Sequence, residues 1–227
     1  MKMKSNMYWI LIALILAFFC RSFLVSVYKI PTVSMAPTFW PGDFIFASRV
    51  TYGLRLPWKS ELYFKSAPAR GDLVVFQFDQ DKAHEKSTAQ YIKRIVAIAD
   101  DEVEIKNSHL YINGRPCTYL KKEQRLSIET FGVFEEDCEN SKREVILSNL
   151  SDSGPLSNFN LIKVPEGQVF VLGDNRDTSD DSRDLGTVHD DQIASKVVAI
   201  WMSYGSTQDF ISGPNKIRWN RILTKPR

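Results

Sequence analysis

The first 28 residues contain the longest apolar stretch of this chain. Residues 7–20 (MYWILIALILAFFC) are apolar without a break, and residues 23–28 continue the stretch beyond Arg21. A helix needs about 20 residues to cross a bilayer, which this stretch supplies if the Arg21 side chain reaches back to the membrane surface. The pattern predicts one transmembrane helix within an N-terminal anchor, residues 1–28.

A cleavable secretory signal is the alternative for the same residues. Lys2 and Lys4 precede the apolar stretch, as in a signal peptide. No small-x-small cleavage site follows it, because Arg21 and bulky side chains occupy that place. A retained anchor is the better hypothesis, and positive charge near both ends leaves its orientation open.

The remaining chain has short apolar stretches with the length of strands and no sustained helical spacing. Asn113-Gly114 between two of them indicates a two-residue hairpin turn, since both residues tolerate positive φ. We predict a mostly β fold, with a β-rich domain over residues 29–227. The expected strands are residues 44–50, 73–78, 91–98, 103–105, 110–112, 169–172 and 197–202.

Two polar stretches depart from this pattern. Residues 79–90 (DQDKAHEKSTAQ) are predicted to form an exposed connection between two strands. Residues 121–160 mix charged residues, Ser, Asn and Gly with few regular apolar positions. We therefore expect an inserted, less regular region that is variable and extends over about residues 113–163.

Composition and charge narrow the classes of function. With 227 residues, 44% of them hydrophobic and 25% charged, the chain has the composition of a globular protein. Its net charge of +2 is too balanced to indicate a nucleic-acid partner. Histidines are few and scattered and no HExxH motif occurs, so we expect no metal and no cofactor. Cys117 and Cys138 either pair in an oxidising compartment or remain free thiols.

Ser34 lies in the segment TVSMAPT, residues 32–38, directly after the apolar stretch. A serine in such a place is most often a loop residue or a helix cap, because a nucleophile also needs a positioned base. Pro31 and Pro37 restrict the backbone on both sides of it. Thr32 adds a second hydroxyl on the same side of an extended segment.

Lys93 and Arg94 interrupt the apolar strand QYIKRIVAI, residues 90–98. Successive residues of a strand face opposite sides, so one of the two cations is expected to point inward. One interpretation is an edge strand whose charges oppose aggregation. The other is a buried lysine, whose pKa falls on desolvation until it can accept a proton, which arginine does not do.

The segment GDNRDTSDDSRDLG, residues 173–186, follows a predicted strand and is rich in charge. A solvated acidic loop and a calcium loop are two interpretations, but the glycine and glutamate spacing of an EF-hand is absent. Arg176 and Arg183 among the acidic residues favour an ion-paired scaffold. Ser179 and Ser182 are placed to form hydrogen bonds within it.

Together these stretches resemble the type I signal (leader) peptidases, membrane-anchored serine proteases with a Ser/Lys dyad. The similar stretches occur in the family's order and cover most of the region after the anchor. They are RSFLVSVYKIPTVSMAPT, PGDFIFASRVTYG, RGDLVVF, QYIKRIVAI and GDNRDTSDDSRDLGTV, with INGRP and KIRWNRI as weaker matches. Thr32 stands where the family often has serine, and Val33 where glycine is common.

The resemblance implies a role for each matching residue. Ser34 would be the nucleophile and Lys93 the general base. The main-chain N–H of Ser34 and the hydroxyl of Thr32 would form the oxyanion hole, and Ser179 would orient the lysine amine. Structural ion pairs around the site would come from Arg94, Asp174, Asp181 and Arg183.

The resemblance also implies a substrate and a location. The substrates would be exported preproteins with small residues at the first and third positions before the cut, bound at the surface of the lipid bilayer. The protein would lie in the cytoplasmic membrane as a single-pass protein, with its catalytic domain on the outer face. No nucleic acid is involved.

Two alternative functions remain open from the residues alone. The same dyad would serve a specialised peptidase that matures a pilin-like substrate of a conjugation or secretion system. A non-catalytic, membrane-tethered peptide-binding protein is the other, although the presence of both Ser34 and Lys93 argues against it. The basic tail, residues 216–227, would contact anionic lipid or remain a solvated terminus.

Overall fold

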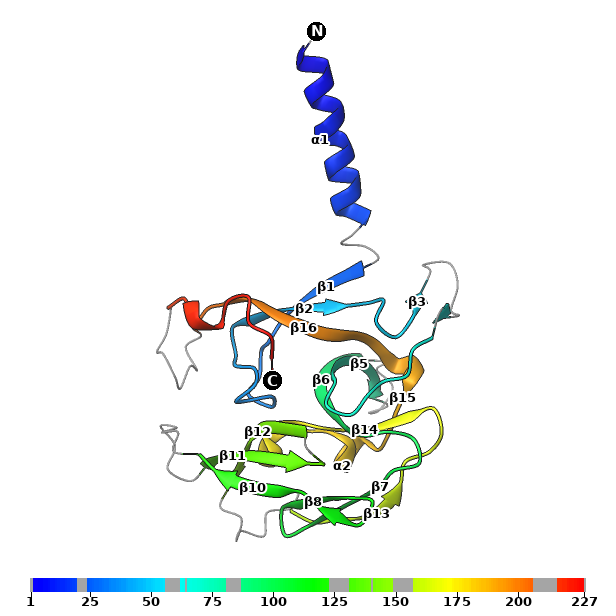
Figure 1. Ribbon diagram of the computed structural model, residues 1–227, viewed down its shortest axis with the longest axis vertical. Helices are drawn as coiled ribbons and strands as arrows, with labels where there is room; N and C mark the ends of the chain where they lie inside the picture. Colours follow the sequence, from blue (N-terminus) through cyan, green and yellow to red (C-terminus); the bar gives the residue numbers. More distant parts are fainter. Residues whose placement is uncertain are drawn as a thin grey trace.

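The computed structural model describes residues 2–19, 24–55, 62–63, 65–80, 87–122, 131–139, 141–148, 157–205 and 216–226. Over these ranges the chain is mostly β and forms several antiparallel sheets, as predicted (Figure 1). The largest sheet has seven strands in the order β1 (Val25–Lys29), β2 (Asp43–Ser48), β16 (Ile193–Ser203), β5 (Leu73–Gln80), β6 (Ser87–Ala97), β14 (Gln168–Leu172) and β15 (Val188–His189).

Smaller sheets and short helices complete the described elements. A four-stranded sheet has the order β13 (Phe159–Lys163), β7 (Glu102–Lys106), β8 (His109–Ile112) and β9 (Arg115–Pro116). A three-stranded sheet contains β10 (Thr118–Lys121), β11 (Phe131–Cys138) and β12 (Ser141–Ser148), and β3 (Leu54–Arg55) pairs with β4 (Leu62–Tyr63). The helices are α1 (Lys2–Phe19), α2 (Ser182–Leu185), η2 (Arg176–Thr178), η3 (Asp190–Gln192) and η4 (Trp219–Arg221).

The strand predictions are confirmed, and one predicted loop is shorter than expected. All seven predicted stretches coincide with strands for most of their length. Asn113 and Gly114 have φ values of 52° and 74° and connect β8 to β9 as a tight hairpin. Much of the polar stretch 79–90 belongs to β5 and β6, because the ladder between them continues to the pair Gln80 and Ser87.

Helix α1 covers 18 residues and points away from the β-rich body (Figure 1). Among the described residues, no helix combines the length and the apolar character needed to cross a membrane. The apolar residues that we expected to continue this helix form β1 instead, paired antiparallel with β2. Val25, Ser26 and Tyr28 of β1 are half-buried, and the pairing with β2 gives this segment a partner other than lipid. Residues 20–23 lie outside the described ranges.

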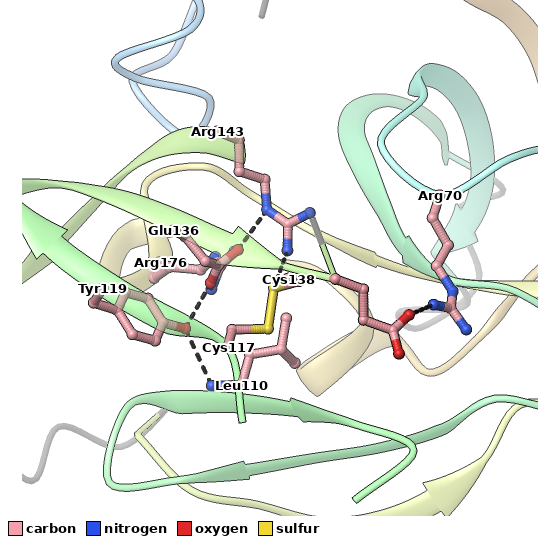
Figure 2. Close-up of a disulfide and its surroundings, with 9 residues drawn as sticks. Arg70, Leu110, Cys117, Tyr119, Glu136, Cys138, Arg143 and Arg176 are labelled. Atoms are coloured by element: carbon pink, nitrogen blue, oxygen red, sulfur yellow. Dashed lines mark hydrogen bonds and ion pairs between the residues drawn. A yellow bond between two sulfur atoms is a disulfide. The ribbon is translucent and has the colours of Figure 1, made fainter. Parts of the chain in front are cut away.

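The region expected to be less regular contains a well-formed sheet. We call β10, β11 and β12 the inserted sheet; β11 and β12 pair in unbroken register over eight residues each. The pattern concealed this sheet because two of its buried positions carry charge, Glu136 (0% exposed) and Arg143 (4%). Cys117 and Cys138 form a disulfide that ties the start of β10 to the end of β11 (Figure 2). Of the two alternatives left open for these cysteines, pairing is correct.

The basic tail is held against the body instead of being solvated. Arg218 is buried and donates hydrogen bonds to Ser203 Oγ (2.7 Å) and the carboxylate of Asp43 (3.2 Å). Arg221 binds the other oxygen of the same carboxylate at 2.6 Å. Trp219 between them is 74% exposed. The tail therefore secures the turn that opens β2.

Candidate active site

Ser34 lies in the connection between β1 and β2, which is anchored at both ends. Main-chain hydrogen bonds join Ile30 to residues 42 and 43 and so close the connection into a loop. Met35 and Phe39 on the loop are buried in an apolar cluster with Ile45 of β2. Ser34 itself is half-buried. Apolar packing on either side thus fixes the backbone of this β1–β2 connection, here called the serine loop, which carries the Ser34 hydroxyl.

Lys93 lies on β6, an interior strand paired with β5 on one side and β14 on the other. The edge-strand interpretation is therefore wrong. One of the two cations was expected to point inward, and the structure buries both, because Lys93 is 3% exposed and Arg94 4%. The two side chains do face opposite sides of the strand, but both sides are covered.

The Lys93 amine meets the serine directly: Nζ donates a hydrogen bond to Ser34 Oγ at 3.1 Å. Burial lowers the pKa of Lys93, and the nearby carboxylates of Asp181, Asp180 and Asp174 act in the opposite direction. The net shift is downward because loss of hydration penalises the charged amine more than these carboxylates favour it. A neutral lysine beside a serine is the arrangement that general-base activation requires.

Thr32 brings a second hydroxyl to the same place. Its Oγ1 lies 3.3 Å from Ser34 Oγ, close enough for a hydrogen bond in which either oxygen is the donor. Thr32 is exposed and the serine only half-buried, so this hydroxyl lies on the solvent side of the reacting oxygen. Thr32 and Lys93, both predicted to act with Ser34, are thus each within hydrogen-bonding reach of its hydroxyl.

The segment from Gly173 to Arg183, here the GDNRD loop, forms buried ion pairs near Lys93. Arg94 donates two hydrogen bonds of 2.8 Å to the Asp174 carboxylate, one from Nε and one from Nη2. Arg183 donates two hydrogen bonds to the Asp181 carboxylate from the same two nitrogens, again at 2.8 Å. Asp181 also accepts the main-chain N–H of Gly173 at 2.9 Å, which closes the loop on itself. The predicted ion-paired scaffold therefore exists.

Ser179 lies inside this loop and is 2% exposed. Among the described residues its Oγ has no hydrogen-bond partner, so its role in orienting the amine stays a prediction. A Cβ added to Gly173 would lie 2.0 Å from Ser179 Oγ and 2.7 Å from the carbonyl oxygen of Ser34. Only glycine at position 173 lets the loop approach the serine this closely.

A pocket of about 410 Å³ opens beside the dyad. It is lined mostly by apolar and uncharged side chains, and its ionisable groups include Lys29, Lys93 and Asp180. Its walls come from the β1 end, the serine loop, β6 and the GDNRD loop: Tyr28, Lys29, Ile30, Pro31, Thr32, Ser34, Met35, Val75, Gln90, Tyr91, Ile92, Lys93, Thr178 and Asp180. In the described part of the chain no cluster of three or more His, Cys, Asp or Glu side chains could hold a metal ion.

The model of the family "Signal peptidase, peptidase S26" matches residues 3–202. The chain belongs to this family. It is 34% identical to signal peptidase I of Pseudomonas fluorescens over 81% of this chain and 67% of the relative. It is 31% identical to the enzyme of Rickettsia canadensis (88% and 78% covered) and 29% identical to that of Buchnera aphidicola from Acyrthosiphon pisum (90% and 76% covered).

A crystal structure of a signal peptidase I from Enterococcus faecalis V583 is 26% identical and covers 58% of this chain and 97% of its own. Its TM-score of 0.34 is too low to add to the fold described above. The family membership confirms the function predicted from the sequence: the chain is a signal peptidase I, a serine peptidase that removes signal peptides.

Two structural partners of this site were missed by sequence reasoning. Thr38 Oγ1 donates to Asp174 Oδ2 at 2.5 Å, on the serine loop itself. Glu136 of the inserted sheet binds Arg176 of the GDNRD loop through two hydrogen bonds. Thr38 falls within the quoted TVSMAPT segment and could have been suspected. Glu136 lies in the region without a transferable motif, so no signal identified it.

Proposed function

We propose that Ser34 is the nucleophile and Lys93 the general base with which this signal peptidase cleaves exported preproteins. The hydrogen bond of 3.1 Å between Lys93 Nζ and Ser34 Oγ carries this proposal. Lys93 is almost fully buried, and burial lowers its pKa, which favours the neutral amine that a base needs. Arginine beside it cannot take this role, because its guanidinium stays protonated.

The reaction follows from the two groups. As Ser34 Oγ attacks the scissile carbonyl, the neutral Lys93 amine takes the hydroxyl proton, and an anionic tetrahedral intermediate forms. Collapse of the intermediate breaks the C–N bond, and Lys93 returns the proton to the departing amine. Water then attacks the acyl-enzyme with the same lysine as base, releasing the second product and restoring the Ser34 hydroxyl.

The oxyanion of that intermediate needs donors aimed at it from the start. The main-chain N–H of Ser34 and the hydroxyl of Thr32 are the groups we assign to this task. The 3.3 Å separation of the Thr32 and Ser34 side-chain oxygens supports the assignment, since it keeps the threonine hydroxyl beside the oxygen that attacks the substrate. Ser179, which is buried within the GDNRD loop, is assigned to orient the lysine amine.

The substrate is an extended peptide with small residues at the first and third positions before the cut. The pocket of about 410 Å³ supports this, since it is lined by β1, the edge strand of the sheet, and by residues 90–93 of β6, which the ladder with β14 does not reach. An extended partner can pair with such strand edges. In a strand, the first and third residues face the same side, so both would enter the pocket. Larger side chains would clash with its walls.

We place the protein at the cytoplasmic membrane, with the catalytic domain on the outer face. The disulfide between Cys117 and Cys138 supports an oxidising compartment for this domain. The side chains of residues 7–15 on α1 are apolar and exposed, which supports contact with the lipid bilayer. Helix α1 would then lie within the anchor, which ends before β1 begins at Val25.

Cleavage of a purified preprotein by the full chain in detergent tests the dyad. Ser34→Ala and Lys93→Ala are each expected to abolish cleavage, with the product's new N-terminus identifying the bond cut by the wild type. Lys163→Ala, which removes an exposed lysine, is the matched control and should cleave normally. Normal cleavage by either dyad variant would refute the assignment.

A further inference from the structure

The inserted sheet packs directly behind the serine loop. Ala36 and Trp40, both on that loop, form one buried apolar cluster with Val133 of β11 and Ile146 of β12. Each of these four residues is at most 5% exposed. The inserted sheet is therefore in contact with the backbone that presents the nucleophile.

The same sheet continues into the GDNRD loop through its main chain. Ile146 N–H donates to the carbonyl of Asp174 at 2.8 Å, and Ile146 forms a parallel bridge with Asn175. Asn175 in turn donates its main-chain N–H to the carbonyl of Ser34 at 3.1 Å and its side-chain amide to that of Val33 at 3.3 Å. Two hydrogen bonds in series thus connect β12 to the nucleophile.

A buried ion pair forms the third connection. Glu136 on β11 accepts hydrogen bonds from both terminal nitrogens of Arg176, at 2.6 and 2.7 Å. Arg176 Nε donates to the carbonyl of Gly173 at 3.1 Å, and Arg183 Nη2 donates to the carbonyl of Arg176 at 2.5 Å. The two terminal nitrogens of Arg176 are therefore held by the inserted sheet. Its Nε and its main-chain carbonyl are held within the GDNRD loop, which also carries Ser179.

Glu136 is the only carboxylate that Figure 2 labels, and it lies between Arg143, Arg176 and Tyr119 beside the disulfide. Burial alone would raise the pKa of Glu136, but Arg143 and Arg176 outweigh it and hold that pKa well below its usual range. Arg143 also donates to Cys138 Sγ at 3.1 Å, so the disulfide and the ion pair share one cluster. The charge on Glu136 is thus kept and its position is fixed.

A buried ion pair of this kind is weak support for stability by itself, since an apolar replacement often serves as well. Its distinctive property is geometry, because a bidentate carboxylate–guanidinium pair fixes both distance and orientation. Here the oriented guanidinium belongs to the loop that supports the dyad, whereas the carboxylate comes from a sheet outside every motif of the active site.

We propose that Glu136 is a positioning residue of this peptidase, which acts through Arg176 to hold the GDNRD loop in register with the dyad. The inference rests on the proposed Ser34–Lys93 dyad. It assigns the inserted sheet a share in catalysis in addition to its share in folding. Substrate contacts the pocket and not Glu136, so Glu136 affects turnover rather than binding.

Steady-state cleavage of a preprotein by Glu136→Gln tests the proposal. The isosteric amide leaves the side-chain volume unchanged but removes the charge, and a shift of reacting groups by about 1 Å costs up to roughly 100-fold in rate. We expect kcat per folded molecule to fall by roughly 10- to 100-fold with KM unchanged, the folded fraction being measured by near-UV circular dichroism. Glu144→Gln, the same change on a half-exposed pair between β12 and Lys122, should leave kcat unchanged.

A double-mutant cycle with Arg176→Lys identifies the route. Lysine keeps the positive charge but loses the paired hydrogen bonds, so this variant tests geometry even where Glu136→Gln folds poorly. If Glu136 acts through Arg176, adding Glu136→Gln to Arg176→Lys should lower kcat by less than twofold more. Independent losses that multiply would overturn the proposal.

A merely structural role gives a different result: less folded protein, but wild-type kcat per folded molecule, and this too would overturn the proposal. Ser34→Ala measured in parallel reports on the dyad alone. If it is inactive while Glu136→Gln keeps full kcat, only the positioning role fails. If it cleaves normally, the dyad assignment fails, whatever Glu136→Gln does.

Discussion

Replacing Asp174 by asparagine removes the charge that neutralises Arg94 inside the protein. The two side chains are 1% and 5% exposed and share two hydrogen bonds of 2.8 Å. Breaking such a buried pair from one side costs about 3–5 kcal/mol, because the guanidinium is left buried without its counter-charge. The native state of a domain is stable by only about 5–15 kcal/mol, so this loss is a large share.

The asparagine side chain still offers one oxygen to Arg94, which places the expected loss near the lower end, about 3 kcal/mol. For a chain of this length that corresponds to a fall in melting temperature of roughly 6–12 °C, at about 2–4 °C for each kcal/mol. Cleavage activity should fall as well, because Asp174 accepts the hydrogen bond of Thr38 on the serine loop.

Urea denaturation followed by tryptophan fluorescence measures the loss, with the full chain kept in detergent because α1 exposes apolar side chains. Asp100→Asn is the matched control: Asp100 pairs with Lys163 at the surface, where the side chains are 83% and 63% exposed. Its urea midpoint should equal that of the wild type. Equal midpoints for Asp174→Asn and wild type would refute the reasoning about burial.

Two further variants test the geometry and the electrostatics of the site. Gly173→Ala should abolish cleavage, since the added Cβ would overlap Ser179 Oγ (2.0 Å) and press on the Ser34 carbonyl (2.7 Å). Activity of the wild type should fall at acidic pH as Lys93 takes up a proton, and Asp180→Asn should move this fall to lower pH. The carboxylate of Asp180 favours the charged amine, so its removal lowers the pKa of Lys93 further.

The controls for these two variants separate local from general effects. Gly114→Ala also places a side chain at positive φ (74°), but nothing lies within 4 Å of the added atom, and it should cleave normally. Full activity of Gly173→Ala would mean that the loop does not need its close approach. For the pH profile, Asp100→Asn should not move the acidic limb. An acidic limb that is the same in Asp180→Asn and wild type would remove Asp180 from the electrostatics of the base.

The chemistry of this site could be predicted from sequence because its groups lie in short, recognisable segments. Ser34 and Lys93 each stand in a distinctive stretch, and the structure brings the two atoms to 3.1 Å. Alternation along the strand could not reveal that both Lys93 and Arg94 are buried. The burial of Arg94 depends on residues that are distant in sequence and pack against its side of the strand, such as Asp174.

The inserted sheet could not be predicted, for a related reason. Its pattern of apolar positions is broken by Glu136 and Arg143, which are charged and yet buried because they neutralise one another. A prediction that assigns charged residues to the surface therefore places both of these buried residues in solvent. The helical anchor was predicted beyond its described length because apolar residues of an edge strand and of a helix look alike over five positions such as Val25–Lys29.

The contacts of Asp43 have a consequence for how the enzyme is made. Arg221 binds both Asp43 and the carbonyl of Thr38, so the loop that bears the nucleophile is fastened by a residue 178 positions after Asp43. A ribosome adding about 5–20 residues per second needs roughly 9–36 s to reach it. During that interval the growing chain already carries its serine but lacks this fastening. The fastening of the serine loop by Arg221 can therefore form only after almost all of the chain has been synthesised.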